Sequence, residues 1–346
     1  MAVQRTDIEQ FLLLTEQHPV IDVRSPGEYN HAHLPGAHSL PLFTDEERKV
    51  VGTAYKQESR ETAIKIGLDY FGPKMRKMVE EVETLLQKHS SADSVQDNRT
   101  ILVYCWRGGM RSGAVAWLLD LYGFKVITLA GGYKKFRNYV LDTFRQPFGF
   151  NMLGGYTGSG KTALLKALEE KNEIVIDLED IAKHKGSAFG NIGMPEQPTQ
   201  EMFENLLAMA LRRSIENSEL AIEKQPDSPF PIAYSPIWLE DESQRIGHVN
   251  IPHELWLTMR NSPVWFLNIP FEERLRQIVQ EYGSLDQERM IGAIERISRK
   301  LGDQHAKAAI ALLKEGNTTE SFSILLSYYD KFYLRSLHNR NDIHTL

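Results

Sequence analysis

The chain has 346 residues, which is more than one hydrophobic core usually serves, so we expect two domains or more. Hydrophobic residues make up 42% and charged residues 25%, which is ordinary globular usage, and no run of about eighteen apolar residues appears that would span a bilayer. The net charge of -6 argues against broad nonspecific binding of nucleic acid, although a local basic face still suffices to hold phosphates. We therefore expect a soluble protein without a membrane partner.

The N-terminal residues and the cysteine content both bear on the compartment. The start, MAVQRTDIEQFLLL, lacks the basic start and the small-residue cleavage site of a secretory signal, so we expect a cytoplasmic protein. Cys105 is the only cysteine, which excludes an internal disulfide framework and a cysteine-rich metal site. Cys105 is therefore either a small buried hydrophobic residue or a working thiol, which the cytoplasm would keep reduced.

Two compact β-branched runs predict buried parallel strands, at residues 20–23 (VIDV) and 101–104 (ILVY). The polar, breaker-rich stretch 88–100 (KHSSADSVQDNRT) between them predicts a surface loop. Helix-like segments alternate with these strands, so an α/β domain with a parallel sheet is predicted over residues 1–140.

A domain junction is predicted after the next apolar run. The strand-like segment 126–130 (VITLA) is followed by 131–150, which contains a glycine turn, a basic amphipathic segment and a proline. We place the boundary near Gln146. The second α/β domain is predicted over 147–270, with a proline-rich break at 223–231 (EKQPDSPFP).

The last part of the chain, 271–346, is predicted to be a helical region packed on the second domain. Its apolar residues recur at helix spacing, which favours a structural core over a ligand site. These residues are Leu275, Ile278, Val279, Ile291, Ile294, Ile297, Phe322, Leu325, Leu326, Tyr329 and Phe332.

The segment 101–119 (ILVYCWRGGMRSGAVAWLL) places Cys105 at the end of a strand and before a helix beginning near Arg111 or Ser112. Backbone N–H groups of a glycine turn and of a helix N-terminus converge on such a position, and Arg107 and Arg111 add two positive charges. This field favours a bound anion and lowers the thiol pKa from a free value of about 8.5. We therefore predict Cys105, Arg107 and Arg111 as catalytic residues.

The segment 150–168 (FNMLGGYTGSGKTALLKAL) contains the full pattern G-x-x-x-x-G-K-T between an apolar strand and an amphipathic helix. The glycines let backbone N–H groups face phosphates, Lys161 supplies a charge, and Thr162 is placed to bind Mg²⁺. Such a loop holds the diphosphate of more than one kind of molecule, so ATP hydrolysis is not implied. The predicted diphosphate-binding residues are Gly155, Gly158, Ser159, Gly160, Lys161 and Thr162.

The acidic companion of the phosphate loop is predicted less directly. The apolar run 174–177 (IVID) ends in Asp177, and Glu179 follows closely, so either side chain could hold a water bound to Mg²⁺. The other interpretation is a solvated acidic turn. The later acidic segment 240–245 (EDESQR) is predicted to be a solvated turn.

Three segments resemble the successive signatures of a rhodanese domain: 20–42 (VIDVRSPGEYNHAHLPGAHSLPL), the cysteine loop, and 126–137 (VITLAGGYKKFR). The resemblance implies that Cys105 carries a transferred sulfur or selenium. Five residues separate Cys105 from Arg111, whereas many single-domain rhodaneses have four. The longer loop also matches C-x5-R-S of the cysteine-dependent phosphatases, some of which share the rhodanese fold, so a phosphatase stays an alternative.

A rhodanese-like half followed by a P-loop half resembles the tRNA 2-selenouridine synthases. The segments 51–57 (VGTAYKQ), 177–190 (DLEDIAKHKGSAFG) and 239–247 (LEDESQRIG) also resemble stretches of that family. The resemblance implies that sulfur of wobble 2-thiouridine in tRNA is replaced by selenium from selenophosphate. It further implies an S-geranyl intermediate made from geranyl diphosphate.

That chemistry implies complementary tasks for the two loops, with Mg²⁺ as the expected ion and no tightly bound cofactor. The P-loop would hold the departing diphosphate, while the Cys105 loop would handle selenophosphate. Candidates for phosphate or tRNA contacts are His184, Lys185, Ser187 and Arg245, together with a basic patch of Lys134, Lys135 and Arg137. Each of these alone is more often a solvated surface residue.

Two questions stay open from the sequence. A P-loop kinase or NTPase with a sulfurtransferase domain is a further alternative to the transferase. A ten-carbon chain would require an apolar groove near the P-loop, but the stripes at 203–211 and 322–332 look equally like core.

Overall fold

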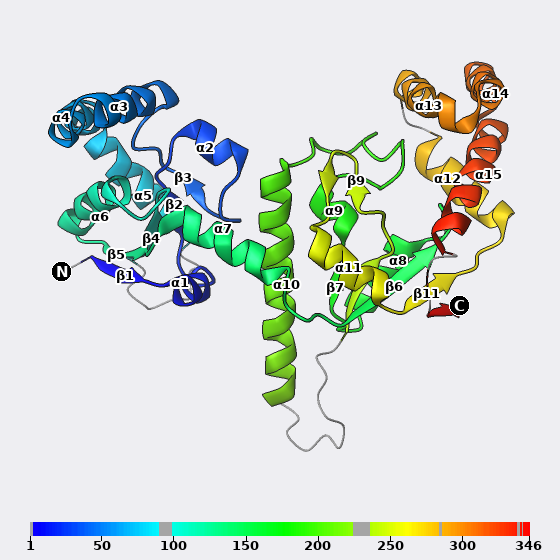
Figure 1. Cartoon of the computed structure of the whole chain (residues 1–346), viewed down its shortest axis with the longest axis horizontal. Helices are drawn as coiled ribbons and strands as arrows, with labels where there is room; N and C mark the ends of the chain where they lie inside the picture. The colour runs from blue at the N-terminus through cyan, green and yellow to red at the C-terminus, as the bar shows by residue number, and fades with distance from the viewer. Residues whose placement is uncertain (1–2, 90–98, 224–235, 284–285, 338–339, 341) are drawn as a thin grey trace. The chain divides into compact units, whose positions relative to one another are not determined.

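The computed structural model describes residues 3–89, 99–223, 236–283, 286–337, 340 and 342–346. These residues form two compact units that divide between Asp142 and Thr143 (Figure 1). Most of the predicted loop at 88–100 and of the predicted break at 223–231 lies outside the described residues. Over the described part of the chain, no helix is long and apolar enough to cross a membrane.

The first unit is built on a five-stranded parallel sheet in the order β1-β5-β4-β2-β3. Every residue of the middle strand β4 is buried, as its apolar sequence TILVY requires. The predicted strands at 20–23, 101–104 and 126–130 are confirmed. The strands are β1 (Gln4–Thr6), β2 (Val20–Asp22), β3 (His38–Ser39), β4 (Thr100–Tyr104) and β5 (Lys125–Leu129).

Helices surround this sheet, and two of them, α3 and α4, pack against each other (Figure 1). Hydroxyl groups cap both: Thr44 accepts from the Glu47 N–H before α3, and Ser59 accepts from the Thr62 N–H before α4. The helices are α1 (Ile8–Leu14), α2 (Pro26–His31), α3 (Asp45–Gln57), α4 (Arg60–Phe71), α5 (Met75–His89), α6 (Met110–Tyr122) and α7 (Gly132–Thr143), with a 3-10 turn at Gly72–Lys74.

The second unit contains another five-stranded parallel sheet, in the order β12-β11-β6-β8-β7. The central strand β6 pairs with β8 so that Leu153 lies opposite Glu240. The carboxyl ends of these two strands therefore meet at one edge of the sheet, where ligands of open α/β folds bind. The strands are β6 (Phe150–Gly155), β7 (Val175–Ile176), β8 (Ile237–Glu240), β11 (Val264–Leu267) and β12 (Ile343–Thr345), with a separate hairpin of β9 (Arg245–Ile246) and β10 (Val249–Asn250).

The helices of the second unit include the predicted helical C-terminal part. Its apolar stripes form one core cluster that includes Leu275, Ile294 and Phe322, so the core interpretation is confirmed for the described side chains. The side chain of Phe332 lies outside them. The helices are α8 (Lys161–Glu169), α9 (Leu178–Ala182), α10 (Gln200–Glu223), α11 (His253–Asn261), α12 (Phe271–Tyr282), α13 (Gln287–Leu301), α14 (Asp303–Lys314) and α15 (Thr318–Leu337).

The end of the chain departs from the helical prediction. Residues Ile343–Thr345 form β12, which pairs in parallel with β11 from Val264 onward. The β-branched residues of this short segment suit an extended edge strand, which satisfies the backbone groups of β11. The region after 271 is thus helical up to α15 and then returns to the sheet.

Candidate active site

Cys105 lies directly after β4, and only 3% of it is exposed. The turn that follows contains Gly108 at φ +62°, where a Cβ atom would come within 2.4 Å of the Leu129 carbonyl oxygen. Glycine is therefore required there by both conformation and space. Helix α6 then begins at Met110, one residue before the earliest predicted start, so the sequence correctly placed the thiol between a buried strand and a helix N-terminus.

The surroundings of Cys105 favour its ionised form. Burial alone raises the pKa of the thiol, but hydrogen bonds from Ser112 and Gly109 and the charge of Arg111 outweigh burial and lower it. The Gly109 N–H donates to Sγ over 3.4 Å, and the Ser112 hydroxyl lies 3.2 Å from Sγ. The net direction agrees with the prediction of an activated thiol.

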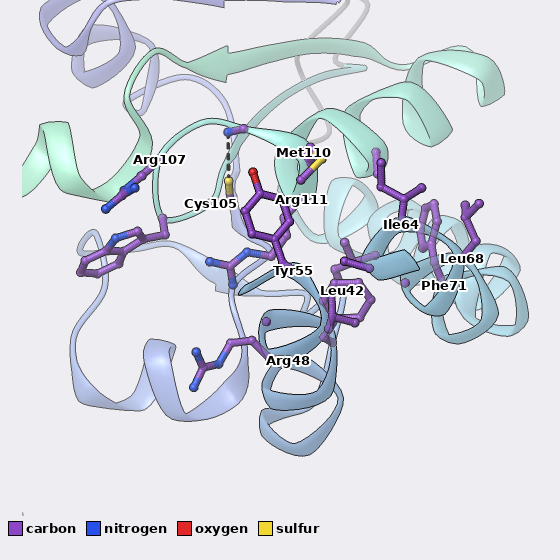
Figure 2. A pocket seen from close by; sticks show the side chains of 18 of the residues that line it. Leu42, Arg48, Tyr55, Ile64, Leu68, Phe71, Cys105, Arg107, Met110 and Arg111 are labelled. Atoms are coloured by element: carbon purple, nitrogen blue, oxygen red, sulfur yellow. Dashed lines mark hydrogen bonds between the residues drawn. The ribbon is translucent and has the colours of Figure 1, made fainter. Parts of the chain in front are cut away.

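Arg111 is held in place by Glu28, a residue that the sequence did not single out. The guanidinium donates from Nη1 to Oε2 over 2.7 Å and from Nη2 to Oε1 over 3.3 Å. Glu28 also accepts from the Ser25 N–H at the start of α2. Burial raises the Glu28 pKa, but Arg111 and Ser25 outweigh it, so the pKa lies below its ordinary value. Arg107 is exposed at the same loop (Figure 2).

A pocket of about 480 Å³ opens beside Cys105 (Figure 2). The cysteine loop forms one side, through Cys105 and Met110, and α3 and α4 contribute apolar side chains such as Val51 and Leu68 respectively. Arg107 and Arg111 also line it. The structure thus brings the three predicted catalytic residues to a single apolar pocket with cationic side chains.

The phosphate loop connects β6 to α8 as predicted. Gly158 at φ +78° and Gly160 at φ +82° adopt the left-handed conformation that presents successive backbone N–H groups to one side. Lys161 Nζ donates to the Gly155 carbonyl over 3.2 Å. The Ser159 hydroxyl is buried without a hydrogen-bond partner among the described residues. A lysine and a hydroxyl are therefore available to the oxygens of a bound diphosphate.

The loop is supported from behind by α12 and α15. Arg274 is buried, donates to the Thr157 carbonyl over 3.2 Å, and forms a two-point ion pair with Asp330. Tyr333 donates to Asp241 and accepts from the Gly155 N–H over 3.0 Å. These contacts explain why the helical part belongs to the same unit: it fixes the conformation of the phosphate loop.

Glu240 is the acid that the sequence missed. The prediction of a solvated turn is wrong for this residue, which is completely buried at the end of β8. Its Oε1 accepts from the Thr162 hydroxyl over 3.1 Å, and its Oε2 has no hydrogen-bond partner in the described part of the chain. An apolar strand ending in an acid was the available signal, but only the pairing of β8 with β6 brings Glu240 to Thr162.

Further carboxylates gather around Glu240. Burial, followed by the charges of Asp177 and Glu242, raises the Glu240 pKa to about 8. Burial, followed by Glu240 and Glu242, raises the Glu179 pKa to about 9, and the Glu242 pKa is raised mainly by burial. Lys161 counteracts all three shifts. Such a cluster favours an added cation or a retained proton.

The side chains at this edge of the sheet fit a phosphate-bound Mg²⁺. Among the described residues, no three His, Cys, Asp or Glu side chains are arranged to hold a metal by themselves. Mg²⁺ in a P-loop needs less, because the phosphates and water supply most of its oxygen ligands. Thr162 and the unpaired oxygen of Glu240 fit this role. Asp177 instead caps α9 by accepting from the Asp180 N–H, and a metal role for Asp177 or Glu179 stays a prediction.

The predicted contact residues of the second unit lie at different places. Ser187 lines a small cavity together with Thr157 of the phosphate loop. His184 is buried, and the Lys185 ammonium forms an ion pair with Glu281. Arg245 is exposed on β9, where its Nε donates to the Gly247 carbonyl. Ser187 thus lies beside the phosphate loop.

The predicted basic patch lies in the first unit, on α7. Lys134 and Lys135 are exposed, and Arg137 is half-buried on the same helix. The Lys134 N–H donates to the Trp106 carbonyl, which joins the start of α7 to the cysteine loop. The backbone of Lys134 is thus held against the cysteine loop, and Lys135 follows it directly in the chain.

Comparisons with known proteins cover both units. Residues 148–345 match the family model described as the tRNA 2-selenouridine synthase AAA domain, and residues 7–139 match the rhodanese-like domain. The tRNA 2-selenouridine synthase of Hydrogenovibrio crunogenus is 34% identical, over 96% of this chain and 92% of that relative. The enzymes of the same name from Aeromonas salmonicida (34% identical, 94% and 88%) and Nitrosomonas europaea (32%, 93% and 90%) are similar over comparable shares. The chain therefore belongs to the tRNA 2-selenouridine synthase family.

Proposed function

We propose that this chain is a cytoplasmic tRNA-modifying transferase that converts wobble 2-thiouridine to 2-selenouridine with selenium from selenophosphate. The observation that carries the proposal is the presence, in one chain of this family, of an activated thiol and an intact phosphate loop. Cys105 has hydrogen-bond donors and Arg111 beside its sulfur, and Thr162 of the phosphate loop lies against the buried Glu240. Relatives over most of the chain are named tRNA 2-selenouridine synthases.

The first step in this proposal takes place at the phosphate loop. The sulfur of 2-thiouridine bonds to the allylic carbon of geranyl diphosphate, the carbon–oxygen bond to the diphosphate breaks, and the base releases its N3 proton to solvent. Lys161 and the backbone N–H groups around Gly158 and Gly160 hold the departing anion. Bound Mg²⁺ would supply further neutralisation of the diphosphate charge. Thr162 and Glu240 would hold that ion, and Glu240 must lose its proton to do so.

The second step belongs to the cysteine loop. Selenium of hydrogen selenophosphate bonds to C2 of the pyrimidine, and the C2–sulfur bond breaks to release the geranyl thiol, which takes the proton. Water then breaks the selenium–phosphorus bond, which leaves 2-selenouridine and inorganic phosphate. The Gly109 N–H, Arg111 and Arg107 stabilise an anion at this loop, and the lowered pKa of Cys105 favours the nucleophilic thiolate form of its sulfur. Selenophosphate is the anion that we assign to it.

The tRNA needs contacts outside both loops, because phosphate contacts position a nucleic acid before chemistry begins. Exposed lysines suit this role, and Lys134 and Lys135 on α7 offer two of them. We assign them to the tRNA backbone, with Arg245 and Ser187 as further candidates in the second unit. His184 and Lys185 are tied more closely to their own unit, through burial and through the ion pair with Glu281.

Reconstitution tests the proposal. The full chain is incubated with a tRNA that carries 2-thiouridine, with geranyl diphosphate, selenophosphate and Mg²⁺, and the nucleosides are then analysed by mass spectrometry. We expect S-geranyl-2-thiouridine without selenophosphate and 2-selenouridine with it. Absence of both nucleosides would refute the proposal. Turnover of an aryl phosphate that is lost in Cys105→Ser would favour a phosphatase, and strong ATP hydrolysis without tRNA would favour an NTPase.

A further inference from the structure

We infer that the apolar pocket beside Cys105 binds the prenyl chain of the S-geranyl intermediate. Binding of the chain there brings C2 of the modified base to the cysteine loop. This inference rests on the proposed function, because it presupposes that an S-geranylated tRNA is the substrate of the second step. It places the prenyl site in the first unit, whereas the sequence predicted an apolar groove near the P-loop.

The size of the pocket fits a ten-carbon chain. Its volume is about 480 Å³. If each carbon with its hydrogens occupies roughly the volume of one water molecule, about 30 Å³, ten carbons need roughly 300 Å³. The remaining space accommodates the sulfur and part of the pyrimidine. Pockets for small organic ligands span this range of volumes, roughly 300 to 1,000 Å³.

The lining of the pocket has the chemistry that such a chain requires. Several large apolar side chains stay exposed to solvent around it, with 55% of Leu68, 51% of Met110 and 51% of Tyr55 accessible. Contiguous exposed apolar surface of this kind marks a binding site, since water contact with it is unfavourable. Ile64 and Phe71 extend the same lining along α4. A prenyl chain would cover these side chains.

Charged side chains accompany this apolar interior. Arg48, Lys56, Arg107 and Arg111 line the same pocket, and among the described residues no acidic side chain does. In Figure 2 Cys105 lies toward one side of the pocket and Leu68 toward the other. An apolar chain attached to a polyanion fits this combination, because the chain contacts carbon while the RNA phosphates meet cations. A chain lying from Leu68 toward Cys105 would bring its sulfur end to the thiol.

The cavity beside the phosphate loop is much smaller than the pocket beside Cys105. The cavity that includes Thr157 and Ser187 has a volume of about 20 Å³, far less than a ten-carbon chain requires. The stripe at 203–211 is core, because Phe203, Leu207 and Leu211 are completely buried. The apolar pocket beside Cys105 is thus the better assignment for the chain after its transfer to sulfur.

Binding of a supplied RNA tests the inference independently of catalysis. The probes are two anticodon stem-loop RNAs that differ only in the wobble nucleoside, S-geranyl-2-thiouridine in one and S-methyl-2-thiouridine in the other. We expect the full chain to bind the S-geranyl RNA at least about tenfold more tightly, measured by fluorescence anisotropy. Leu68→Asp should remove most of this preference, so that the S-geranyl RNA binds only about as tightly as the S-methyl RNA does to the same variant.

Leu121→Asp is the matched control. Leu121 is 69% exposed on α6 and does not line the pocket, so this variant should keep the preference. Ile64→Trp narrows the pocket by volume rather than charge and provides a second variant if Leu68→Asp fails to fold. The inference is overturned if the wild-type chain shows no preference, or if the preference survives in both pocket variants.

The reconstitution described above separates this result from failure of the proposed function. If the wild-type chain makes both modified nucleosides but the pocket variants keep the preference, the pocket assignment alone is wrong. If the wild-type chain makes neither nucleoside, the proposed function fails, whatever the RNA-binding preference shows.

Discussion

Arg111 and Glu28 form a two-point ion pair across 83 residues of sequence, with the shorter contact, from Nη1 to Oε2, at 2.7 Å. The pair is partly buried, with side-chain exposures of 23% and 19%. A planar guanidinium held by two hydrogen bonds keeps one orientation, so Arg111 presents a fixed charge to the Cys105 loop. Glu28 is therefore a positioning residue for the thiol site.

We expect Glu28→Gln to weaken both stability and selenation. Loss of a partly buried carboxylate opposite Arg111 should lower the free energy of unfolding by about 1–3 kcal/mol near neutral pH. In the wild type this contribution is present above the ordinary glutamate pKa and is lost as pH falls through the lowered pKa of Glu28. Denaturant unfolding at pH 7 and pH 3 measures it. Glu46→Gln, an exposed substitution on α3, is the control that should change neither property.

Ser112→Ala should raise the pKa of Cys105. The Ser112 hydroxyl is the strongest of the influences that lower this pKa, and burial alone would raise it. Thiolate predominates above the pKa and is lost as pH falls through it, so the pH midpoint of iodoacetamide alkylation should move upward in the variant. Because Cys105 is the only cysteine, the alkylation rate reports on this thiol alone. An unchanged midpoint would contradict the role given to Ser112.

From the raised pKa values of the buried acids we expect the free energy of unfolding of the metal-free protein to fall as pH rises. Glu240 and Glu179 keep protons in the folded chain up to a pKa of about 8 and about 9, but ionise from about 4.5 once unfolded. The unfolded chain therefore binds fewer protons between these values, and the free energy of unfolding falls with pH.

Glu240→Gln should flatten this slope and raise the Tm at pH 8 in EDTA. A gain of about 1 kcal/mol corresponds to roughly 2–4 °C for a unit of this size. Mg²⁺ with diphosphate should then stabilise the wild type more than the variant, since the ion needs the ionised carboxylate. Glu196→Gln, on the surface, is the control. If Glu240→Gln leaves the Tm at pH 8 unchanged or lowers it, the buried Glu240 carboxyl does not destabilise the metal-free protein.

Gly158→Ala should disrupt the phosphate loop. At φ +78° an added Cβ would lie 2.8 Å from Ile278 Cγ1 and 2.9 Å from the Arg274 carbonyl oxygen. Conformational strain and overpacking together should cost about 2–5 kcal/mol and abolish geranylation. Gly316→Ala isolates the conformational part, because Gly316 has φ +82° with open space around it. Equal losses of stability in the two variants would show that packing against α12 does not matter.

The phosphate loop and the thiol loop were predicted from the sequence because each is formed by neighbouring residues. The phosphate loop needs glycines, Lys161 and Thr162 in consecutive positions, and the thiol loop needs a strand before Cys105 and a helix after it. Both arrangements are local, so motif and context were sufficient to locate them.

The parts that sequence missed depend on distant pairing. Glu28 reaches Arg111 through the order of β2 and β4 in one sheet, and Glu240 reaches Thr162 through the pairing of β6 with β8. Neither order follows from the hydrophobic pattern of the strands. The pocket beside Cys105 was missed for a similar reason, because α3 and α4 carry scattered apolar residues whose common surface appears only once the helices pack.

Division of labour between the two loops is tested most directly by starting from the intermediate. Wild-type, Lys161→Ala and Cys105→Ser chains are each given an RNA that already carries S-geranyl-2-thiouridine, with selenophosphate, and 2-selenouridine is quantified by mass spectrometry. We expect Lys161→Ala to form 2-selenouridine nearly as well as the wild type, because the diphosphate step is bypassed, and Cys105→Ser to form little or none. Selenation by Cys105→Ser at the wild-type rate, or its loss in Lys161→Ala alone, would contradict the account.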